Sequence, residues 1–195
     1  MIVVSILFAY LLGSISSSYI AGKMAAGVDI REHGSGNAGA TNTLRVLGYK
    51  LGLIVFIADI AKGVLAVAFA HLVTNGSETA MALSGLFAVL GHNWPIYFGF
   101  RGGKGVATTI GVLMTIALVP SLYAGLVALV LLIFTRYVSL SSLTYVMLTP
   151  IFQLFFHTAA ITVIVSFVLL LLSFWRHRGN IDRLLHGREH RVFSK

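Results

Sequence analysis

The stretch GSGNAGATNTLR, residues 34–45, has the residue types and spacing of an anion-binding loop. Its glycines let backbone N–H groups surround an anion at short range, and Arg45 adds a guanidinium that suits phosphate. Four neutral side chains add hydrogen-bonding groups: Ser35, Asn37, Thr41 and Asn42. The alternative is a flexible turn. The glycines also fit GxGxxG, but no strand precedes them and no βαβ unit surrounds them, which argues against dinucleotide binding.

A second polar stretch, GHNWPIYFGFRGGKGVAT, covers residues 91–108. Its Gly-Gly-Lys-Gly sequence enters a hydrophobic segment, so it offers backbone N–H groups, the positive end of a helix and the Lys104 charge. It is not a Walker A loop, because GxxxxGK[ST] does not match. Arg101 is explained by its place beside a membrane span, whereas Lys104 lies among glycines and is a phosphate-binding candidate. His92 is interpreted as a hydrogen-bonding residue at a helix end, with catalysis as the alternative.

A third polar stretch covers residues 177–189. Four cationic or titratable residues there and just beyond fit a basic tail facing anionic lipid: Arg188, His190, Arg191 and Lys195. Asn180, Gly187 and Glu189 add no positive charge, so a binding role explains them better. The hydroxyls after Arg136 either belong to a site or bond back to their own helix. These hydroxyl residues are Ser139, Ser141, Ser142 and Thr144.

Long apolar segments separate these polar stretches. The chain is 57% hydrophobic and 10% charged, whereas a soluble domain carries about 25% charged residues. Runs of about 20 apolar residues fit a hydrocarbon core of about 30 Å, and their continuity favours helices over a barrel. We therefore predict an all-α polytopic transmembrane helix bundle with about seven spans, in a single domain over residues 1–195. The predicted segments are 2–22, 51–73, 80–98, 106–118, 121–135, 139–156 and 158–175.

Two of these segments, 106–118 and 121–135, are short and flank Pro120. They are expected either to span the membrane with tilt or local thinning, or to form a re-entrant hairpin with a turn at Pro120. The first alternative gives about seven spans and the second about five.

The cations are distributed unevenly among the loops. Of 14 Lys and Arg residues, all except Lys62 follow an odd-numbered segment. They are Lys23, Arg31, Arg45, Lys50, Arg101, Lys104, Arg136, Arg176, Arg178, Arg183, Arg188, Arg191 and Lys195. The positive-inside rule then places the N-terminus outside and the C-terminus in the cytoplasm, and it favours the larger span count. The polar stretches are thus predicted to converge on the cytoplasmic face.

That convergence predicts a substrate with phosphate groups and a membrane lipid partner. The formal net charge of +8 is interpreted as orientation and anion binding, with no nucleic acid partner. There is no cysteine, and the histidines and acids show no metal-ligand spacing, so no metal site is expected.

Lys62 falls inside the second apolar segment, with Asp59 three residues earlier on the same helix face. An isolated Lys at the bilayer centre costs roughly 2.5–3.5 kcal/mol on insertion scales. A mutually neutralising pair that packs the bundle is the favoured interpretation. The alternative is that Lys62 contributes electrostatically to a nearby anion site.

The polar stretches together resemble the signature motifs of the bacterial acyl-phosphate:glycerol-3-phosphate acyltransferase family. The resemblance rests on GSGNAGATNTLR, GHNWPIYFGFRGGKGVAT and NIDRLLHGRE, in family order, and on RYVSLSS at residues 136–142. It covers essentially the whole chain. One departure is Arg101, where the family often has Lys. His177 and Asp182 also match the HxxxxD pattern of a different class of glycerolipid acyltransferases, which we interpret as coincidence.

The resemblance implies transfer of a fatty acyl group from acyl phosphate to the sn-1 hydroxyl of glycerol 3-phosphate, in phospholipid biosynthesis. The products would be lysophosphatidic acid and inorganic phosphate, without a cofactor. It also implies a multi-pass protein of the bacterial cytoplasmic (inner) membrane, with the active site facing the cytoplasm.

Site residues follow from the resemblance and from the chemistry of two phosphate-bearing substrates. The acyl-phosphate head group is expected on Ser35, Gly36, Asn37, Ala38, Gly39, Ala40, Thr41 and Asn42. Glycerol 3-phosphate is expected on Arg45, Lys104 and Asn180, with Ser142 and Glu189 as further candidates. Catalytic roles are expected for Ser35, Lys104 and His177.

The proton acceptor is left open among several groups. His177 has a suitable ordinary pKa, Glu189 and Asp182 are alternatives, and a phosphate oxygen of the substrate is favoured. A rival from another class is a transporter or channel for a phosphorylated solute. It predicts polar residues along several spans, and the spans are nearly bare of them. A purely structural membrane protein leaves the density of Gly, Asn and Ser unexplained.

Overall fold

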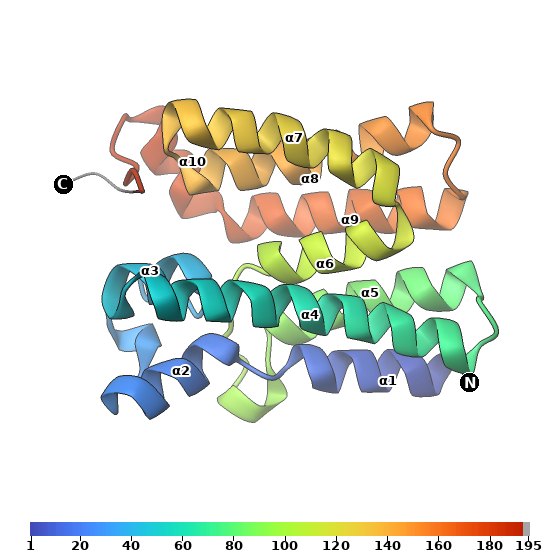
Figure 1. Cartoon of the computed structure of the whole chain (residues 1–195), viewed down its shortest axis with the longest axis horizontal. Coiled ribbons are helices and arrows are strands. Elements are labelled where there is room, and N and C mark those ends of the chain that lie inside the picture. The colour runs from blue at the N-terminus through green and yellow to red at the C-terminus, as the bar shows by residue number, and fades with distance from the viewer. Residues whose placement is uncertain (193–195) are drawn as a thin grey trace. The chain divides into compact units, whose positions relative to one another are not determined.

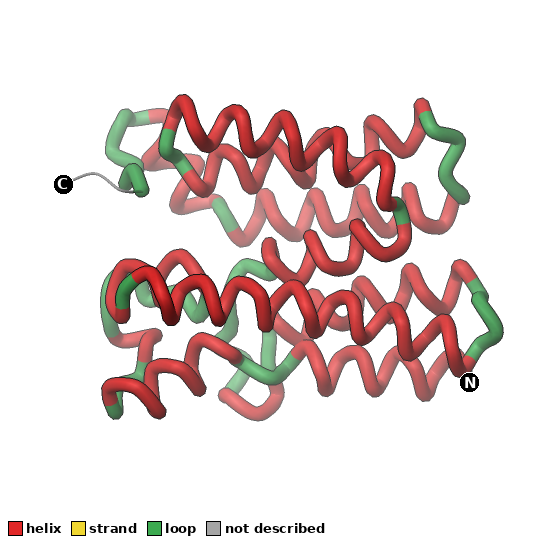
Figure 2. The backbone as a smooth tube through the Cα atoms, viewed as in Figure 1, coloured by secondary structure: helices red, strands yellow, loops and turns green. Residues whose placement is uncertain are grey.

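The structure, a computed structural model, describes residues 1–192, and all regular structure in that part of the chain is helical (Figures 1 and 2). The prediction of an all-helical protein is confirmed. Lys195, assigned above to a basic tail, lies outside the described residues. The helices are α1 Ile2–Gly13, α2 Ser17–Ala26, η1 Ile30–Glu32, α3 Ala40–Leu47, α4 Tyr49–Val73, α5 Glu78–Asn93, η2 Ile96–Phe98, α6 Val106–Ile116, α7 Leu118–Thr135, α8 Val138–Phe155, α9 Ala160–Arg176 and α10 Arg178–Leu185.

The chain divides into two compact units, Met1–Ile116 and Ala117–Lys195. The single domain expected over residues 1–195 stays a prediction. In the first unit α4 packs against α1, α5, α6 and α3, and α1 packs against α5. Small residues allow this: a Cβ on Gly13 of α1 would run into the backbone of Ala88 on α5, and one on Gly63 of α4 into the Thr108 carbonyl on α6. Helices of this unit therefore approach at backbone distance, as in many membrane bundles.

The polar stretches of the first unit gather at one end of its bundle. Figure 1 shows α2 and α3 at the end of α4 opposite to the chain's N-terminus. The first predicted segment is interrupted, since α1 ends at Gly13 and α2 begins at Ser17. Ser16 caps α2 by accepting a hydrogen bond from the Tyr19 N–H. The interruption lets α2 lead toward the loop at residues 34–45.

In the second unit α8 packs against α7 and α9, and α10 follows α9 after a bend of 64°. The predicted turn at Pro120 is wrong, because Pro120 lies in the first turn of α7, and the helix is interrupted at Ala117 instead. Proline is tolerated there because first-turn N–H groups have no helical acceptor.

Four helical segments are long and apolar enough to cross a membrane, or five if the bent pair α9 and α10 counts as one span. They are Ile2–Ala26, Tyr49–Val73, Leu118–Thr135 and Val138–Phe155. Each of the predicted segments contains a helix, but α6 has only 11 residues, about 16 Å at 1.5 Å per residue. The structure supports a multi-pass protein with four to five such spans. The larger count and the orientation stay predictions.

Candidate functional site

The loop at residues 34–45 is held together by the side chain of Asn42, which is 1% exposed. Its Oδ1 accepts from the Ser35 N–H at 2.8 Å, and its Nδ2 donates to the carbonyls of Ile30 and His33, both at 3.0 Å. Gly34 has φ +61°, and a Cβ there would run into Asn42 Oδ1. Asn42 therefore organises the loop from inside.

Several backbone N–H groups of this loop donate within it rather than outward. Those of Ser35 and Gly39 have acceptors inside the loop, and that of Gly36 donates to the His33 carbonyl just before it. The N–H groups of Ala40 and Thr41 begin α3 and have no acceptor in the described part of the chain, as expected for a first helical turn. The N–H groups that remain available to an anion are thus those at the start of α3, where the helix end is positive.

The exposed face of α3 also carries the guanidinium of Arg45. Thr41 and Arg45 are exposed and lie one turn apart on the same face, whereas Asn42 and Thr43 point into the protein. Ser35 and Gly36 are exposed as well, while Asn37 and Ala40 are half-buried. The sequence indicated that this segment is polar, but not that the Asn42 side chain faces inward.

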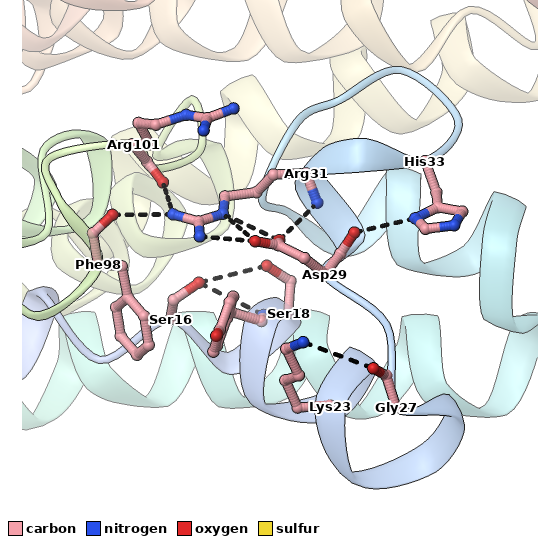
Figure 3. A network of polar contacts seen from close by, with 10 residues as sticks. Ser16, Ser18, Lys23, Gly27, Asp29, Arg31, His33, Phe98 and Arg101 are labelled. Carbon is pink, nitrogen blue, oxygen red and sulfur yellow. Dashed lines mark hydrogen bonds and ion pairs between the residues drawn. The ribbon is translucent and has the colours of Figure 1, made fainter.

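An ion pair clamps the segment before this loop to the second polar stretch (Figure 3). Asp29 pairs with Arg31 at 2.7 Å, and Arg31 Nη1 donates to the Phe98 carbonyl at 2.8 Å and to the Arg101 carbonyl at 3.4 Å. The hydrogen bond from Arg31 lowers the pKa of Asp29 to about 2. The Arg31 guanidinium also lies over the Tyr19 ring. This clamp was not predicted, because Arg31 was considered only as a loop charge.

The Gly-Gly-Lys-Gly stretch packs directly onto the first loop. The Gly103 N–H donates to the His92 carbonyl at 3.1 Å, and a Cβ on Gly103 would run into both His92 Nε2 and the Ala38 carbonyl. Gly105 has φ +78°, in the left-handed region that favours glycine. Lys104 is half-buried between these glycines. The first two polar stretches therefore meet, as predicted.

Two buried side chains beneath this stretch belong to the end of α5. His92, 7% exposed, takes the helix-end position expected for it. Asn93 is fully buried, and within the described residues neither its Oδ1 nor its Nδ2 has a hydrogen-bond partner. Asn93 was missed by the sequence reasoning, although its place between His92 and Trp94 in the second stretch was a usable signal.

The predicted pair in α4 is present. Asp59 Oδ1 lies 3.0 Å from Lys62 Nζ, and both side chains are buried. The ion pair confirms the mutual neutralisation expected from the sequence.

The third polar stretch belongs to the second unit and is organised around Glu189. Its carboxylate accepts hydrogen bonds from Ser139 Oγ at 3.0 Å, Asn180 Nδ2 at 2.7 Å and Arg183 Nε at 2.7 Å. Burial would raise the pKa of Glu189, but the three donors outweigh it, so the pKa lies below its ordinary value. Glu189 therefore joins α10 to the start of α8.

Three other residues named in the sequence analysis belong to the second unit. His177, 3% exposed, has Nδ1 at 2.8 Å from the Ser173 carbonyl. Ser142 donates to the Val138 carbonyl of its own helix at 2.8 Å, one of the two alternatives left open for the hydroxyls. Asp182 is exposed and lies 3.3 Å from His186.

The chain was compared with known proteins. Residues 3–187 match the family model described as glycerol-3-phosphate acyltransferase. A glycerol-3-phosphate acyltransferase of Shouchella clausii is 52% identical over 100% of this chain and 97% of its own length. That of Bacillus subtilis is 45% identical over 98% of both chains.

Two solved structures share the fold. A crystal structure of PlsY, an integral membrane glycerol 3-phosphate acyltransferase, in its glycerol 3-phosphate form has a TM-score of 0.93 at 41% identity, covering 98% of this chain and 95% of that one. The lysophosphatidic acid form has a TM-score of 0.90 at 40% identity. The family match extends into both compact units and covers the first two polar stretches and residues 177–187 of the third. This chain belongs to the glycerol-3-phosphate acyltransferase family of integral membrane proteins that includes PlsY.

Proposed function

We propose that the chain transfers a fatty acyl group from acyl phosphate to the sn-1 hydroxyl of glycerol 3-phosphate. The hydroxyl oxygen bonds to the acyl carbon, the bond from that carbon to the phosphate oxygen breaks, and inorganic phosphate leaves with lysophosphatidic acid as the other product. The related PlsY has been solved in a glycerol 3-phosphate form and in a lysophosphatidic acid form. These are the acceptor and the product of this reaction.

The observation that carries the proposal is the meeting of the two glycine-rich stretches. Arg31 and Gly103 join the Lys104 segment to the loop that leads into α3. The reaction needs two phosphate groups held close together, and positioning of reactants supplies much of the rate of such transfers. This end of the first unit offers Arg45, Lys104 and helix-start N–H groups that have no acceptor in the described residues.

The proposed roles follow from where these groups lie. The acyl phosphate binds at residues 35–42, with the N–H groups of Ala40 and Thr41 facing its phosphate. Arg45 and Lys104 of the first unit bind the phosphate of glycerol 3-phosphate. The roles expected for Asn180 and Ser142 of the second unit stay predictions. Asn42 and Glu189 act by holding their segments in shape, since their polar atoms are engaged inside them.

The proposed proton acceptor is a phosphate oxygen of the substrate. Acyl phosphate is already an activated anhydride, so attack needs a well-placed hydroxyl and stabilisation of the oxyanion that forms on the carbonyl. Ser35 is exposed at the loop and is the proposed oxyanion donor. His177 is the rival base. Loss of turnover in His177→Ala with unchanged binding of glycerol 3-phosphate would favour the histidine.

The proposed location is the bacterial inner membrane, with the C-terminus and the polar stretches in the cytoplasm. It is supported by the cations, which lie in segments that follow alternate apolar helices. Seven crossings require α5, α6 and α9 to cross as well, in spite of their shorter lengths of 16, 11 and 17 residues.

In the experiment, purified protein is incubated with glycerol 3-phosphate and either palmitoyl phosphate or palmitoyl-CoA. The variants Lys104→Met and Lys50→Met are assayed in the same way. Lys50 is an exposed cation near the start of α4 and serves as the matched control. We expect product from palmitoyl phosphate only, a loss of about 100-fold or more in Lys104→Met, equivalent to about 2.7 kcal/mol, and wild-type rates in Lys50→Met. Product from palmitoyl-CoA alone would refute the donor, and no product from well-folded protein would refute the function.

A further inference from the structure

The buried Asp59–Lys62 ion pair of α4 also makes hydrogen bonds to the residues between α1 and α2 and at the start of α2. Lys62 Nζ donates to the Ile15 carbonyl at 2.9 Å, and Ser17 Oγ donates to Asp59 Oδ1 at 3.0 Å. Asp59 is 1% exposed and Lys62 is 5% exposed. A carbonyl released where a helix stops needs a partner in apolar surroundings. The pair thus fixes the start of α2, beyond neutralising its own charges.

The same carboxylate reaches the phosphate-binding stretch through one histidine. Asp59 Oδ1 lies 3.7 Å from His92 Nδ1, and Thr108 Oγ1 lies 3.4 Å from that nitrogen. The other side of the ring, at Nε2, packs against Gly103, whose N–H donates to the His92 carbonyl at 3.1 Å. Gly103 directly precedes Lys104. A continuous set of contacts therefore leads from the middle of α4 to the backbone of the proposed phosphate-binding lysine.

An ion pair that only neutralised its own two charges could be replaced by two neutral side chains without any effect on its neighbours. Substituting one partner of a buried pair leaves an uncompensated charge and is strongly destabilising, whereas neutral side chains of similar volume at both positions are often tolerated. Asp59 and Lys62, however, each contact a group outside the pair. Replacing both is therefore expected to preserve folding while releasing the start of α2 and the His92 ring.

We propose that Asp59 and Lys62 are positioning residues that act through His92 to hold the Gly103–Lys104 backbone where Lys104 binds the phosphate of glycerol 3-phosphate. Neither residue touches the substrate. The inference rests on the proposed function, because it assigns Lys104 to the acceptor site. It extends that function by linking the acceptor site to a charge pair in the interior of the helix bundle.

The test compares the double variant Asp59→Leu/Lys62→Met, which has no hydrogen-bonding group for Ser17 or His92 at position 59, with wild type and with Gln153→Met. Gln153 is fully buried in α8, 11 residues from Ser142, or about 16 Å along the helix, and is the matched control for loss of a buried polar group. Steady-state kinetics are measured for both substrates, and the Kd of glycerol 3-phosphate is measured calorimetrically without donor. We expect the double variant to raise the KM and Kd of glycerol 3-phosphate about tenfold, or 1.4 kcal/mol. The KM of palmitoyl phosphate is expected to stay within about twofold.

Two histidine variants test the same connection independently of how the double variant folds. His92→Asn keeps a nitrogen near the position that faces Asp59 and removes the one against Gly103, whereas His92→Gln does the reverse. Both interrupt the connection, so both are expected to raise the KM and Kd of glycerol 3-phosphate. Combining either with the double variant is expected to give no further increase, since residues acting in one chain of contacts are not additive.

Wild-type Kd in the histidine variants, or an equal loss of affinity for both substrates, would overturn the inference. So would fully additive effects in a folded combined variant. The binding measurement separates this inference from the proposed reaction. Wild-type protein that binds glycerol 3-phosphate but makes no product from palmitoyl phosphate refutes the proposed donor and leaves the positioning test intact. Wild-type protein that does not bind glycerol 3-phosphate refutes both.

Discussion

Replacing Asn42 by Asp is expected to open the loop at residues 34–45 with almost no change in side-chain volume. The Asp side chain keeps the acceptor for the Ser35 N–H but replaces the amide that donates to Ile30 and His33 by an oxygen. Two hydrogen bonds of about 1 kcal/mol each are lost, and a buried oxygen then faces two carbonyl oxygens, so the ordered loop is destabilised by about 2–4 kcal/mol. That energy lowers the ratio of ordered to disordered loop by roughly 30- to 700-fold. The ordered population falls by the same factor if the wild-type loop is only marginally stable.

The assay combines kinetics with hydrogen exchange. In Asn42→Asp, kcat/KM for palmitoyl phosphate should fall by up to that factor, and amide exchange of the segment 31–45 should speed up, while the helices of the bundle keep their protection. Glu32→Gln, an exposed neutral replacement beside the same loop, should leave both readouts unchanged. Activity within about threefold of wild type together with unchanged exchange would refute the role given to Asn42.

Glu189→Gln removes the charge shared by three donors and should lower Tm by several degrees, at about 2–4 °C per kcal/mol for a chain of this size. Because the pKa of Glu189 is lowered in the folded protein, the stabilisation that its carboxylate gives is complete above the ordinary pKa of 4.5 and is lost as pH falls through the folded pKa. Thermal melts should therefore show the Tm values of variant and wild type converging at acid pH. A Tm difference that does not change with pH would contradict the lowered pKa. Gly103→Ala would drive its Cβ into the His92 ring and the Ala38 carbonyl, so the KM of glycerol 3-phosphate should rise about tenfold. Gly125→Ala, where the nearest atom is 3.9 Å from the added Cβ, should keep wild-type kinetics, and an equal effect in both would indicate general loss of packing.

The helices were predictable because long apolar runs carry their own signal. The errors in the predicted segments lie at positions where one or two residues determine where a helix ends. The predicted segment 80–98 stops at Asn93, since residues just before Pro95 are disfavoured in the α conformation. The interruption between α1 and α2 was missed, although the serines after Gly13 are good helix caps. A hydropathy pattern averages over such positions, so it locates a segment but not the interruption inside it.

The composition of the site was predictable, whereas the direction of each side chain was not. Asn42 and Thr41 are neighbours of similar polarity, yet one is buried and the other exposed. Glu189 was read as a substrate ligand from its motif, and its carboxylate is engaged by three donors of its own unit. Whether a polar group faces a ligand or holds a loop depends on contacts between distant segments, which sequence spacing does not contain.

Three acids of the protein hold backbone segments through ion pairs. Asp29, Asp59 and Glu189 are each paired with a cation, at 2.7, 3.0 and 2.7 Å. Each of these carboxylates thereby fixes a backbone segment and is neutralised in place. Within the described residues, Arg45 and Arg101 have no such ion pair.

A protein with 14 Lys and Arg but only 6 Asp and Glu can therefore use three of its acids as clamps and still present net positive charge. Attraction of dianionic substrates should then depend on the ionic strength, since exposed charges are screened over about 10 Å at 0.1 M salt. The buried clamps are screened much less. Salt is thus expected to weaken the capture of glycerol 3-phosphate at the proposed site before it disturbs the clamps.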